Sequence, residues 1–227
     1  MSNFIITIDG PAASGKSTAA RLLAQKLGAD FLDTGAMYRA VTYAAMKADT
    51  DLSDENKLID VMESCEFDFI PENSSMKVFL DKRDITELIR DSQVTANSRY
   101  IASARKVREK LVQTQRQFAA NRNAIVTEGR DQGTVAFPDA NVKFFLIAQP
   151  AERAKRRLAE LEAKGKAGSL EEIQKSIEKR DQSDMNRNVG PLKPAQDAIV
   201  IDTTNIDIEQ VIEKLYSIVT ERGYKTD

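Results

Sequence analysis

The sequence predicts an α/β fold, in which helices flank a parallel sheet and a small antiparallel lobe is inserted into the parallel framework. Three observations support this prediction. A glycine-containing loop at residues 10–17 separates an apolar run from a helix-forming run, strand and helix patterns then alternate, and this alternation gives way near residue 50 to a hairpin pattern. The chain has 227 residues, enough for one domain of this kind.

The first four elements follow a strand–helix–strand–helix order. Residues 4–8 are apolar and β-branched, which predicts a buried strand, and residues 17–27 predict a helix that ends at Gly28. Residues 30–35 predict a short strand ending in a loop, and residues 36–47 predict the next helix. This order is typical of a parallel sheet with crossover helices.

The pattern changes after residue 48. Residues 53–61 predict a short amphipathic helix. Residues 65–70 and 76–80 alternate apolar with polar side chains around a polar segment at 71–75, which predicts a hairpin. We therefore expect an inserted lobe at about 49–104, within a core formed by about 1–48 and 105–227.

The remaining elements return to the parallel pattern. We expect helices at 86–104 and 106–119, a central strand at 124–128, a buried strand at 142–147, a last strand at 199–201 and a closing helix at 208–220. An arginine-rich helix at 150–163 is followed by a polar break at 164–168, and residues 169–172 match a capping box that starts another helix. This pair of helices is interpreted as a mobile lid over about 153–187, although an ordinary surface hairpin of helices fits the pattern equally well.

Composition excludes several classes of function. The chain has 33 basic and 35 acidic side chains, a net charge of −2, which argues against a general nucleic-acid or membrane-surface binder. It has one cysteine and no histidine, which excludes an internal disulfide, a cysteine metal site and a histidine base. No apolar run is long enough for a membrane span, and the first strand begins almost at the N-terminus, so we expect a soluble cytoplasmic protein.

Residues 10–17, GPAASGKS, match the phosphate-loop pattern G-x-x-x-x-G-K-[ST] between a strand and a helix. Backbone N–H groups of such a loop close around polyphosphate oxygens, at the positive end of the helix. Lys16 is then expected to reach the β- and γ-phosphates, and the Ser17 hydroxyl to ligate Mg²⁺. The motif predicts binding of a nucleoside triphosphate and leaves the phosphate acceptor open.

Arginine and aspartate recur where strands end. Arg39 follows the second strand, Arg130 and Asp131 follow the third, and Arg187 lies near the end of a helix. A single arginine is more often a solvated surface charge, but the carboxyl ends of parallel strands share one crevice, so Arg39 and Arg130 are expected to project toward the same crevice as Lys16. Phosphoryl transfer needs positioning and charge neutralisation, which arginines supply without a histidine.

Several segments together resemble the successive signatures of bacterial cytidylate kinases. They are IDGPAASGKS at 8–17, LDTGAMYR at 32–39, EGRDQGTV at 128–135 with FPD at 137–139, and KRDQSDMNR at 179–187, followed by Pro191-Leu192, Asp197-Ala198 and DTT at 202–204. The resemblance spans nearly the whole chain. It implies a five-stranded parallel sheet of the P-loop NTPase type, an antiparallel lobe that binds the nucleoside monophosphate, and a helical lid. It also implies transfer of the γ-phosphoryl group of ATP to CMP or dCMP with Mg²⁺.

The resemblance also implies roles for particular residues. For ATP these are Gly10, Pro11, Ala12, Ala13, Ser14, Gly15, Lys16, Ser17 and Thr18, with Arg153 and Arg157 approaching from the lid. For CMP they are Thr34, Arg39, Arg108, Arg130, Asp131, Arg180, Asp184 and Arg187. Within that set Arg39, Arg130 and Arg187 are implied for the phosphate, Arg180 and Asp184 for the ribose, and Arg108 and Asp131 for the base. The implied catalytic residues are Lys16, Arg130, Arg157 and Arg187.

The base assignment has a physical reason. Cytosine offers an amino donor beside ring and carbonyl acceptors, so Asp131 can accept while Arg108 donates. Uracil would leave both buried groups mispaired, which discriminates strongly. Counting back from Arg108 without gaps places Arg99 where the family often has a serine that contacts the base, and Ser98 is its neighbour. Neither residue is assigned as a base contact.

The sequence leaves alternatives open for the metal site. Glu128 stands where the family usually has aspartate, and Gln132 where it usually has an apolar residue. Glu128 lies either near the magnesium ion or in a structural role at a strand end. Without a further strand-end acid, Mg²⁺ is expected on Ser17, phosphate oxygens and water, with Asp33 either supporting it through water or tying the loop.

Two other functions are alternatives. The first is a kinase for another small acceptor, such as UMP or a coenzyme precursor. The second is a nucleotide-switched binding protein, which the lack of an Asn-Lys-x-Asp segment disfavours. We expect a monomer and no covalent enzyme intermediate.

Overall fold

A five-stranded parallel sheet lies at the centre of the computed structural model, which describes residues 3–72, 75–163, 165 and 167–225. Its strands are β1 (Phe4–Asp9), β2 (Asp30–Asp33), β6 (Ala124–Gly129), β7 (Val142–Ile147) and β8 (Ile199–Asp202), in the order β2-β6-β1-β7-β8. The predicted parallel sheet is confirmed, and β6 is an inner strand that pairs with β2 on one side and β1 on the other. The middle strand of the five is β1, which pairs with β6 and β7.

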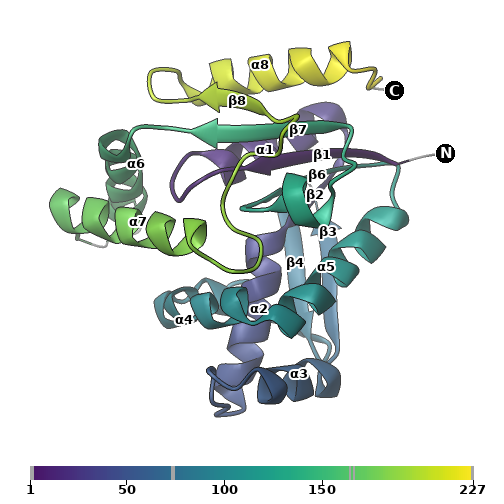
Figure 1. The fold of residues 1–227 in the computed structure, drawn as a ribbon, viewed down its shortest axis with the longest axis vertical. Coiled ribbons are helices and arrows are strands. Elements are labelled where there is room, and N and C mark those ends of the chain that lie inside the picture. Colours follow the sequence, from purple (N-terminus) through teal and green to yellow (C-terminus); the bar gives the residue numbers. More distant parts are fainter. Residues whose placement is uncertain (1–2, 73–74, 164, 166, 226–227) are drawn as a thin grey trace.

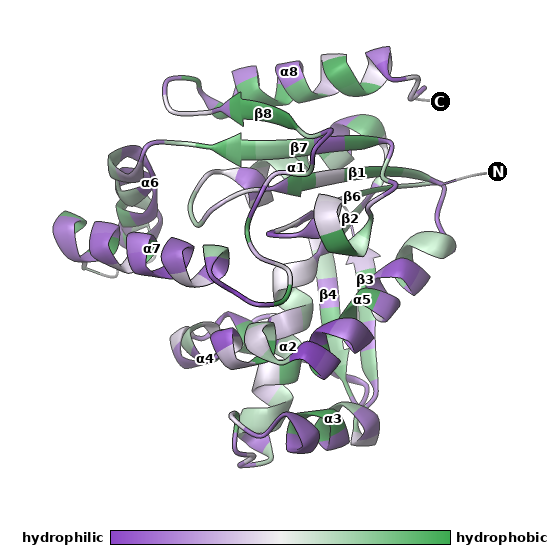
Figure 2. Cartoon of the chain, viewed as in Figure 1, coloured by the Kyte–Doolittle hydropathy of each residue, from purple (hydrophilic) through white to green (hydrophobic). Residues whose placement is uncertain are grey.

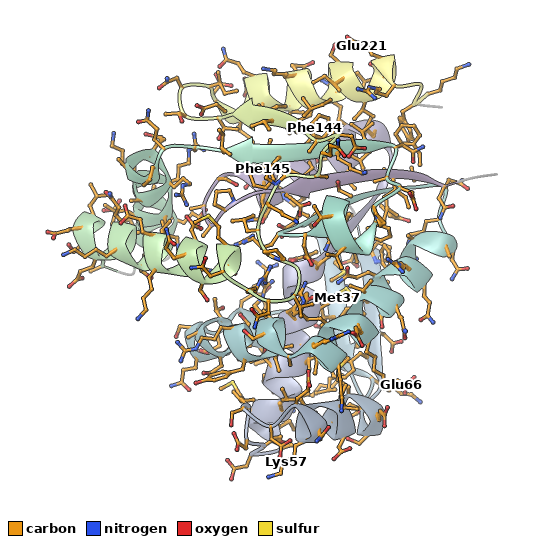
Figure 3. All side chains as sticks on the ribbon, viewed as in Figure 1. Met37, Lys57, Glu66, Phe144, Phe145 and Glu221 are labelled. Atoms are coloured by element: carbon orange, nitrogen blue, oxygen red, sulfur yellow. The ribbon has the colours of Figure 1, made fainter. Side chains whose placement is uncertain are left out.

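Helices cover both faces of this sheet, which explains why its strands are apolar throughout. On one face, α1 (Lys16–Leu27) and α8 (Ile208–Glu221) enclose a core that includes Phe144 of β7. On the other face, α2 (Thr34–Lys47), α5 (Arg105–Ala120) and the inserted lobe enclose a second core that includes Met37. Figure 2 shows hydrophilic residues on the outer sides of α5 and α8, and Figure 3 labels Phe144 and Met37 in their separate layers.

The helix after β2 begins earlier than the sequence predicts. We expected a loop before residue 36, but α2 starts at Thr34 because the Asp33 carboxylate accepts a hydrogen bond from the Ala36 N–H at 2.8 Å. The end of α1 is as predicted, with Gly28 in the left-handed conformation (φ 65°).

The inserted lobe contains α3 (Glu55–Ser64), the strands β3 (Phe67–Glu72), β4 (Ser75–Leu80) and β5 (Arg83–Asp84), a short 3₁₀ turn at Leu88–Arg90, and α4 (Ser92–Ser103). The antiparallel hairpin is confirmed, while the turn residues 73–74 lie outside the described part. The single helix predicted at 86–104 is wrong. Asp91 accepts a hydrogen bond from the Gln93 N–H, so a new helix starts at Ser92 after the 3₁₀ turn.

Two helices, α6 (Pro150–Glu162) and α7 (Leu170–Met185), pack on each other beyond the carboxyl ends of β1 and β7 (Figure 1). Two residues of the predicted break between them, Lys164 and Lys166, lie outside the described residues. The capping box predicted at 169–172 is not formed, because the Ser169 side chain makes no capping hydrogen bond. These helices occupy the place of the predicted lid.

Candidate functional site

The phosphate loop follows β1 at the carboxyl edge of the sheet. Gly10 is required there: a Cβ on this residue would lie 2.3 Å from the carbonyl oxygen of Leu146 in the neighbouring strand. Gly15 adopts φ 86° directly before α1, whose first turn has no side-chain cap. The uncapped N–H groups at this helix start are therefore available to an anion.

Lys16 is buried at the bottom of this loop. Its Nζ lies 3.3 Å from the Pro11 carbonyl oxygen and 3.8 Å from a Glu128 carboxylate oxygen. Burial, with the positive charge of Arg130 as the next cause, lowers the pKa of Lys16 to about 8, against the opposing effect of Glu128. A bound polyphosphate would place negative charge close to this buried ammonium group, which has no closely bound anionic partner among the described residues.

Glu128, the penultimate residue of β6, lies beside the phosphate loop and is also buried. Its Oε1 accepts a hydrogen bond from the Ser17 hydroxyl at 3.0 Å, and its backbone oxygen accepts one from the Thr34 hydroxyl at 2.7 Å. Asp33 is engaged elsewhere, with the Ala36 N–H and with Arg39 Nη2 at 3.3 Å. Of the two acids considered from the sequence, Glu128 is the one in contact with Ser17.

No group of three or more acidic, cysteine or histidine side chains that would hold a metal ion by itself occurs among the residues with described positions. The Ser17 hydroxyl and the Glu128 carboxylate are nevertheless the hard oxygen donors that Mg²⁺ prefers. These two residues fit a magnesium ion whose other ligands are phosphate oxygens and water.

Three charged residues from two segments, the end of β6 and the end of α7, form a second cluster. Arg130 Nε lies 2.7 Å from Asp184 Oδ2, and Arg187 Nη1 lies 3.8 Å from Asp184 Oδ1. Burial alone would raise the pKa of Asp184, but the charges of Arg130 and Arg187 outweigh it and lower this pKa. Asp184 is therefore ionised at neutral pH and holds the two arginines at one place.

Arg108 of α5 and Asp131 form a buried, hydrogen-bonded ion pair. Arg108 also donates to the Ala102 carbonyl oxygen at 3.1 Å, and its guanidinium lies 5.5 Å from the centre of the Tyr38 ring. Burial raises the pKa of Tyr38 to about 12. A donor, an acceptor and an aromatic ring thus meet at one buried place.

Three buried guanidinium nitrogens in this region have no hydrogen-bond partner among the described residues: the Nε atoms of Arg39, Arg108 and Arg187. Buried polar atoms are normally paired, so three unpaired donors in one region indicate a place for a ligand rich in acceptor oxygens. Arg180 belongs to the same region, since the charges of Arg130, Asp184, Arg39 and Arg157 act on it. The structure therefore brings together the arginines that the sequence placed on separate elements.

The two predicted lid arginines differ in their surroundings. Arg153 is buried and donates to the carbonyl oxygens of Ala148 and Ala12 and to Asp181, whereas Arg157 is exposed and pairs with Glu160 at 2.8 Å. Arg153 thus ties α6 to α7 and to the phosphate loop in this structure. Asp181, which the sequence reasoning did not single out, completes this tie by accepting a hydrogen bond from the Ala12 N–H at 3.0 Å.

Two other placements bear on the sequence analysis. The Ser98 hydroxyl donates to the Thr95 carbonyl oxygen at 2.8 Å, and Arg99 is exposed with its guanidinium over the Tyr100 ring. Arg156, also missed, donates to the hydroxyl and carbonyl oxygens of Thr203, whose hydroxyl donates to the Ser14 carbonyl oxygen at 3.2 Å. The run of three arginines in α6 gave no sign of which one faces the loop.

A phosphate loop and a cluster of arginines at the carboxyl edge of a parallel sheet define a phosphotransferase of the P-loop class. Comparison with known proteins narrows this class. The family model described as cytidylate kinase matches residues 6–221. The chain therefore belongs to the cytidylate kinase family.

Individual relatives agree with this assignment. A cytidylate kinase of Carboxydothermus hydrogenoformans is 46% identical over 98% of both chains. Those of Leuconostoc mesenteroides subsp. mesenteroides and Clostridioides difficile are 45% and 44% identical, over 96% of this chain and 97% and 98% of theirs. Among solved structures, a shikimate kinase of Bacteroides thetaiotaomicron aligns at 14% identity and a TM-score of 0.47, covering 96% of this chain and 98% of that one; it is too distant to bear on function.

Along the described residues, no helix combines the length and the apolar character that crossing a membrane requires.

Proposed function

We propose that this protein transfers the γ-phosphoryl group of ATP to a phosphate oxygen of CMP or dCMP, giving ADP and CDP or dCDP. The observation that carries the proposal is the buried Arg108–Asp131 pair next to the unpaired Nε atoms of Arg39 and Arg187. Base-reading and phosphate-binding groups then lie together at the sheet edge that also carries Lys16.

The acceptor is bound from base to phosphate. Asp131 accepts a hydrogen bond from the cytosine amino group, and Arg108 donates one to the base. These bonds partly replace the hydrogen bond that Arg108 and Asp131 make to each other. Arg39, Arg130 and Arg187 bind the phosphate, with Asp184 holding the last two in place. Asp184 and Arg180 are then next to the ribose, and Thr34 lines the phosphate end.

The donor is bound by the phosphate loop, residues Gly10 to Thr18. Lys16 and the arginines neutralise the charge that develops during an in-line transfer between the two nucleotides. Ser17 and Glu128 would hold Mg²⁺, which when bound offsets charge on the β- and γ-phosphates. Arg157, which is exposed and pairs only with its helix neighbour Glu160 in the described structure, is free to swing toward the transferring group; Arg153 and Asp181 fix the loop on which this happens.

Three parts of the chain share this work. The core at about 1–48 and 105–227 carries ATP, the lobe at about 49–104 encloses the acceptor, and the lid at about 153–187 excludes water on closing. The expected cytoplasmic location and monomeric state stay predictions.

The variant Asp131→Asn tests the proposed acceptor. An amide in place of the carboxylate offers a donor to the cytosine amino group, so the ratio of kcat/KM for CMP to kcat/KM for UMP should fall by about 100-fold. ATP affinity should change by less than about threefold, because the phosphate loop is untouched. The matched control is Asp139→Asn, an exposed aspartate of the same segment, which should leave both values as in the wild type. An unchanged CMP/UMP ratio in Asp131→Asn would show that Asp131 does not read the base.

A further inference from the structure

Asp9, the last residue of β1, is a buried acid that the proposed transfer does not use. It directly precedes the phosphate loop, and its side chain is 4% exposed. An ionised carboxylate in such a place is costly unless it accepts hydrogen bonds. Both of its oxygens are used in this way.

The two bonds go to one segment on the acceptor side. Asp9 Oδ1 accepts from the Gln132 N–H at 2.9 Å, and Oδ2 accepts from the Gly133 N–H at 2.8 Å. These are the first two residues of a π-helical turn at Gln132–Ala136, which the sequence did not predict and which immediately follows Arg130 and Asp131. A single side chain therefore joins the strand that precedes the phosphate loop to the turn that directly follows two proposed acceptor-binding residues.

Other residues hold the rest of this turn. Arg116 of α5 donates to the carbonyl oxygens of Val135 and Ala136, at its far end, and the Thr127 hydroxyl donates to the Gln132 side chain at 3.0 Å. The N–H groups of Val135 and Ala136 turn back to the Asp131 carbonyl oxygen. For the N–H groups of Gln132 and Gly133, within the described part of the chain, Asp9 is the acceptor.

We propose that Asp9 is a positioning residue for the phosphoryl acceptor, holding Arg130 and Asp131 in register with the phosphate loop through the Gln132 and Gly133 N–H groups. This inference rests on the proposed function for the identity of the acceptor. It assigns Asp9 an effect on the acceptor and little effect on ATP, although Asp9 is adjacent to the ATP loop in sequence.

The pKa of the Asp9 carboxyl group is also raised. Burial raises the pKa of Asp9 to about 7, against the two backbone N–H bonds; the charge of Asp131 raises this pKa further and that of Arg130 lowers it. On the β7 side, Lys143 packs near Gly133, but its ammonium group is bound to Asp197 and to the Pro138 carbonyl oxygen. The ionised form accepts both N–H bonds fully, so acceptor binding should strengthen as pH rises through about 7.

The main experiment compares Asp9→Asn with Thr7→Val. Asparagine keeps the shape but turns an NH₂ group toward one of the two N–H donors. Thr7 lies on the same strand, its side chain also packs against Gly133, and its buried hydroxyl has no hydrogen-bond partner in the described structure. Thr7→Val is therefore a buried, nearly isosteric control that changes packing beside the turn but removes none of the turn's hydrogen bonds. The KM for CMP should rise about tenfold in Asp9→Asn, with the affinity for ATP changed less than about threefold, and Thr7→Val should match the wild type.

The pH profile separates positioning from general damage. The wild-type KM for CMP should fall as pH rises from 6 to 8 by more than the CMP phosphate titration accounts for, and Asp9→Asn should show only the substrate part. Equal losses for ATP and CMP, or a CMP KM equal to that of the wild type, would overturn the proposal. Wild-type enzyme that does not phosphorylate CMP at all would instead refute the proposed function.

A second measurement serves if Asp9→Asn does not fold. In the wild-type protein, the amide NMR signals of Gln132 and Gly133 should titrate together, at the pH where the extra change in CMP KM occurs. Signals that stay fixed through that pH would overturn the proposal.

Discussion

Replacing Lys16 by methionine should make the unliganded protein more stable while removing its activity. The fold buries this ammonium group with only the Pro11 carbonyl oxygen and the more distant Glu128 as partners. Methionine preserves the length and the apolar part of the side chain and removes the charge.

The size of the effect follows from the lowered pKa. A pKa lowered from 10.5 to about 8 corresponds to about 3 kcal/mol of folding free energy, at about 1.4 kcal/mol per pKa unit. This figure already includes the attraction to Glu128, because Glu128 acts on the same pKa. Loss of the hydrogen bond to Pro11 costs about 1 kcal/mol, so the variant should be about 2 kcal/mol more stable at pH 7.

The pH dependence has a definite sign. Below pH 8 the folded and unfolded states both carry the proton, and the destabilisation is fully present. Between pH 8 and 10.5 the folded state loses its proton first, so the free energy of unfolding of the wild type gains a rising contribution that the variant lacks. The stability difference between the two should therefore shrink as pH rises from 8 to 10.

Urea unfolding of nucleotide-free protein at pH 7, 8, 9 and 10 measures this difference. Lys175→Met is the control: Lys175 is exposed and paired with Glu171 one helical turn away, so its loss should change stability by less than about 0.5 kcal/mol. Phosphoryl transfer should fall at least about 100-fold in Lys16→Met, since a charge facing the transferred group is lost. A variant less stable than the wild type at pH 7, or a stability difference independent of pH, would refute the reasoning.

The lid arginines give two further predictions with opposite readouts. Arg153→Met leaves the buried Asp181 without its charged partner, so the free energy of unfolding should fall by about 3–5 kcal/mol in urea unfolding. A loss below about 1 kcal/mol would contradict a structural tie. Arg157→Met removes an exposed charge, so stability should change by less than about 0.5 kcal/mol while kcat falls at least about tenfold; unchanged kcat in steady-state assays would remove Arg157 from the transfer step.

The parts of the fold that the sequence predicted are those set by neighbouring residues. The strand before the phosphate loop, the loop itself and the helix ending at Gly28 lie within one short stretch, and apolar runs long enough to be buried on both faces predicted β6 and β7. Which polar residue caps the start of a helix was harder to predict. Asp33 and Asp91 start helices that the sequence analysis placed elsewhere, while Ser169, in a matching motif, does not cap its helix.

The site was predictable in its residue types and less so in its contacts. Strand ends predicted that Arg39 and Arg130 share an edge with Lys16. Nothing near Arg153 in the sequence indicated that Asp181, 28 residues away, takes its guanidinium. Asp9 escaped notice for the same reason, since its partners at 132 and 133 are backbone groups of a turn that carries no sequence signal.

The central claim is that the cleft accepts cytidine monophosphates, and an acceptor panel tests it most directly. Initial rates with ATP and magnesium should be measured over a range of CMP, dCMP, UMP and AMP concentrations, with ADP formation as the readout. We predict that kcat/KM for CMP or dCMP exceeds that for UMP and for AMP by at least about 100-fold. A higher kcat/KM for UMP or AMP than for both cytidine nucleotides would contradict it.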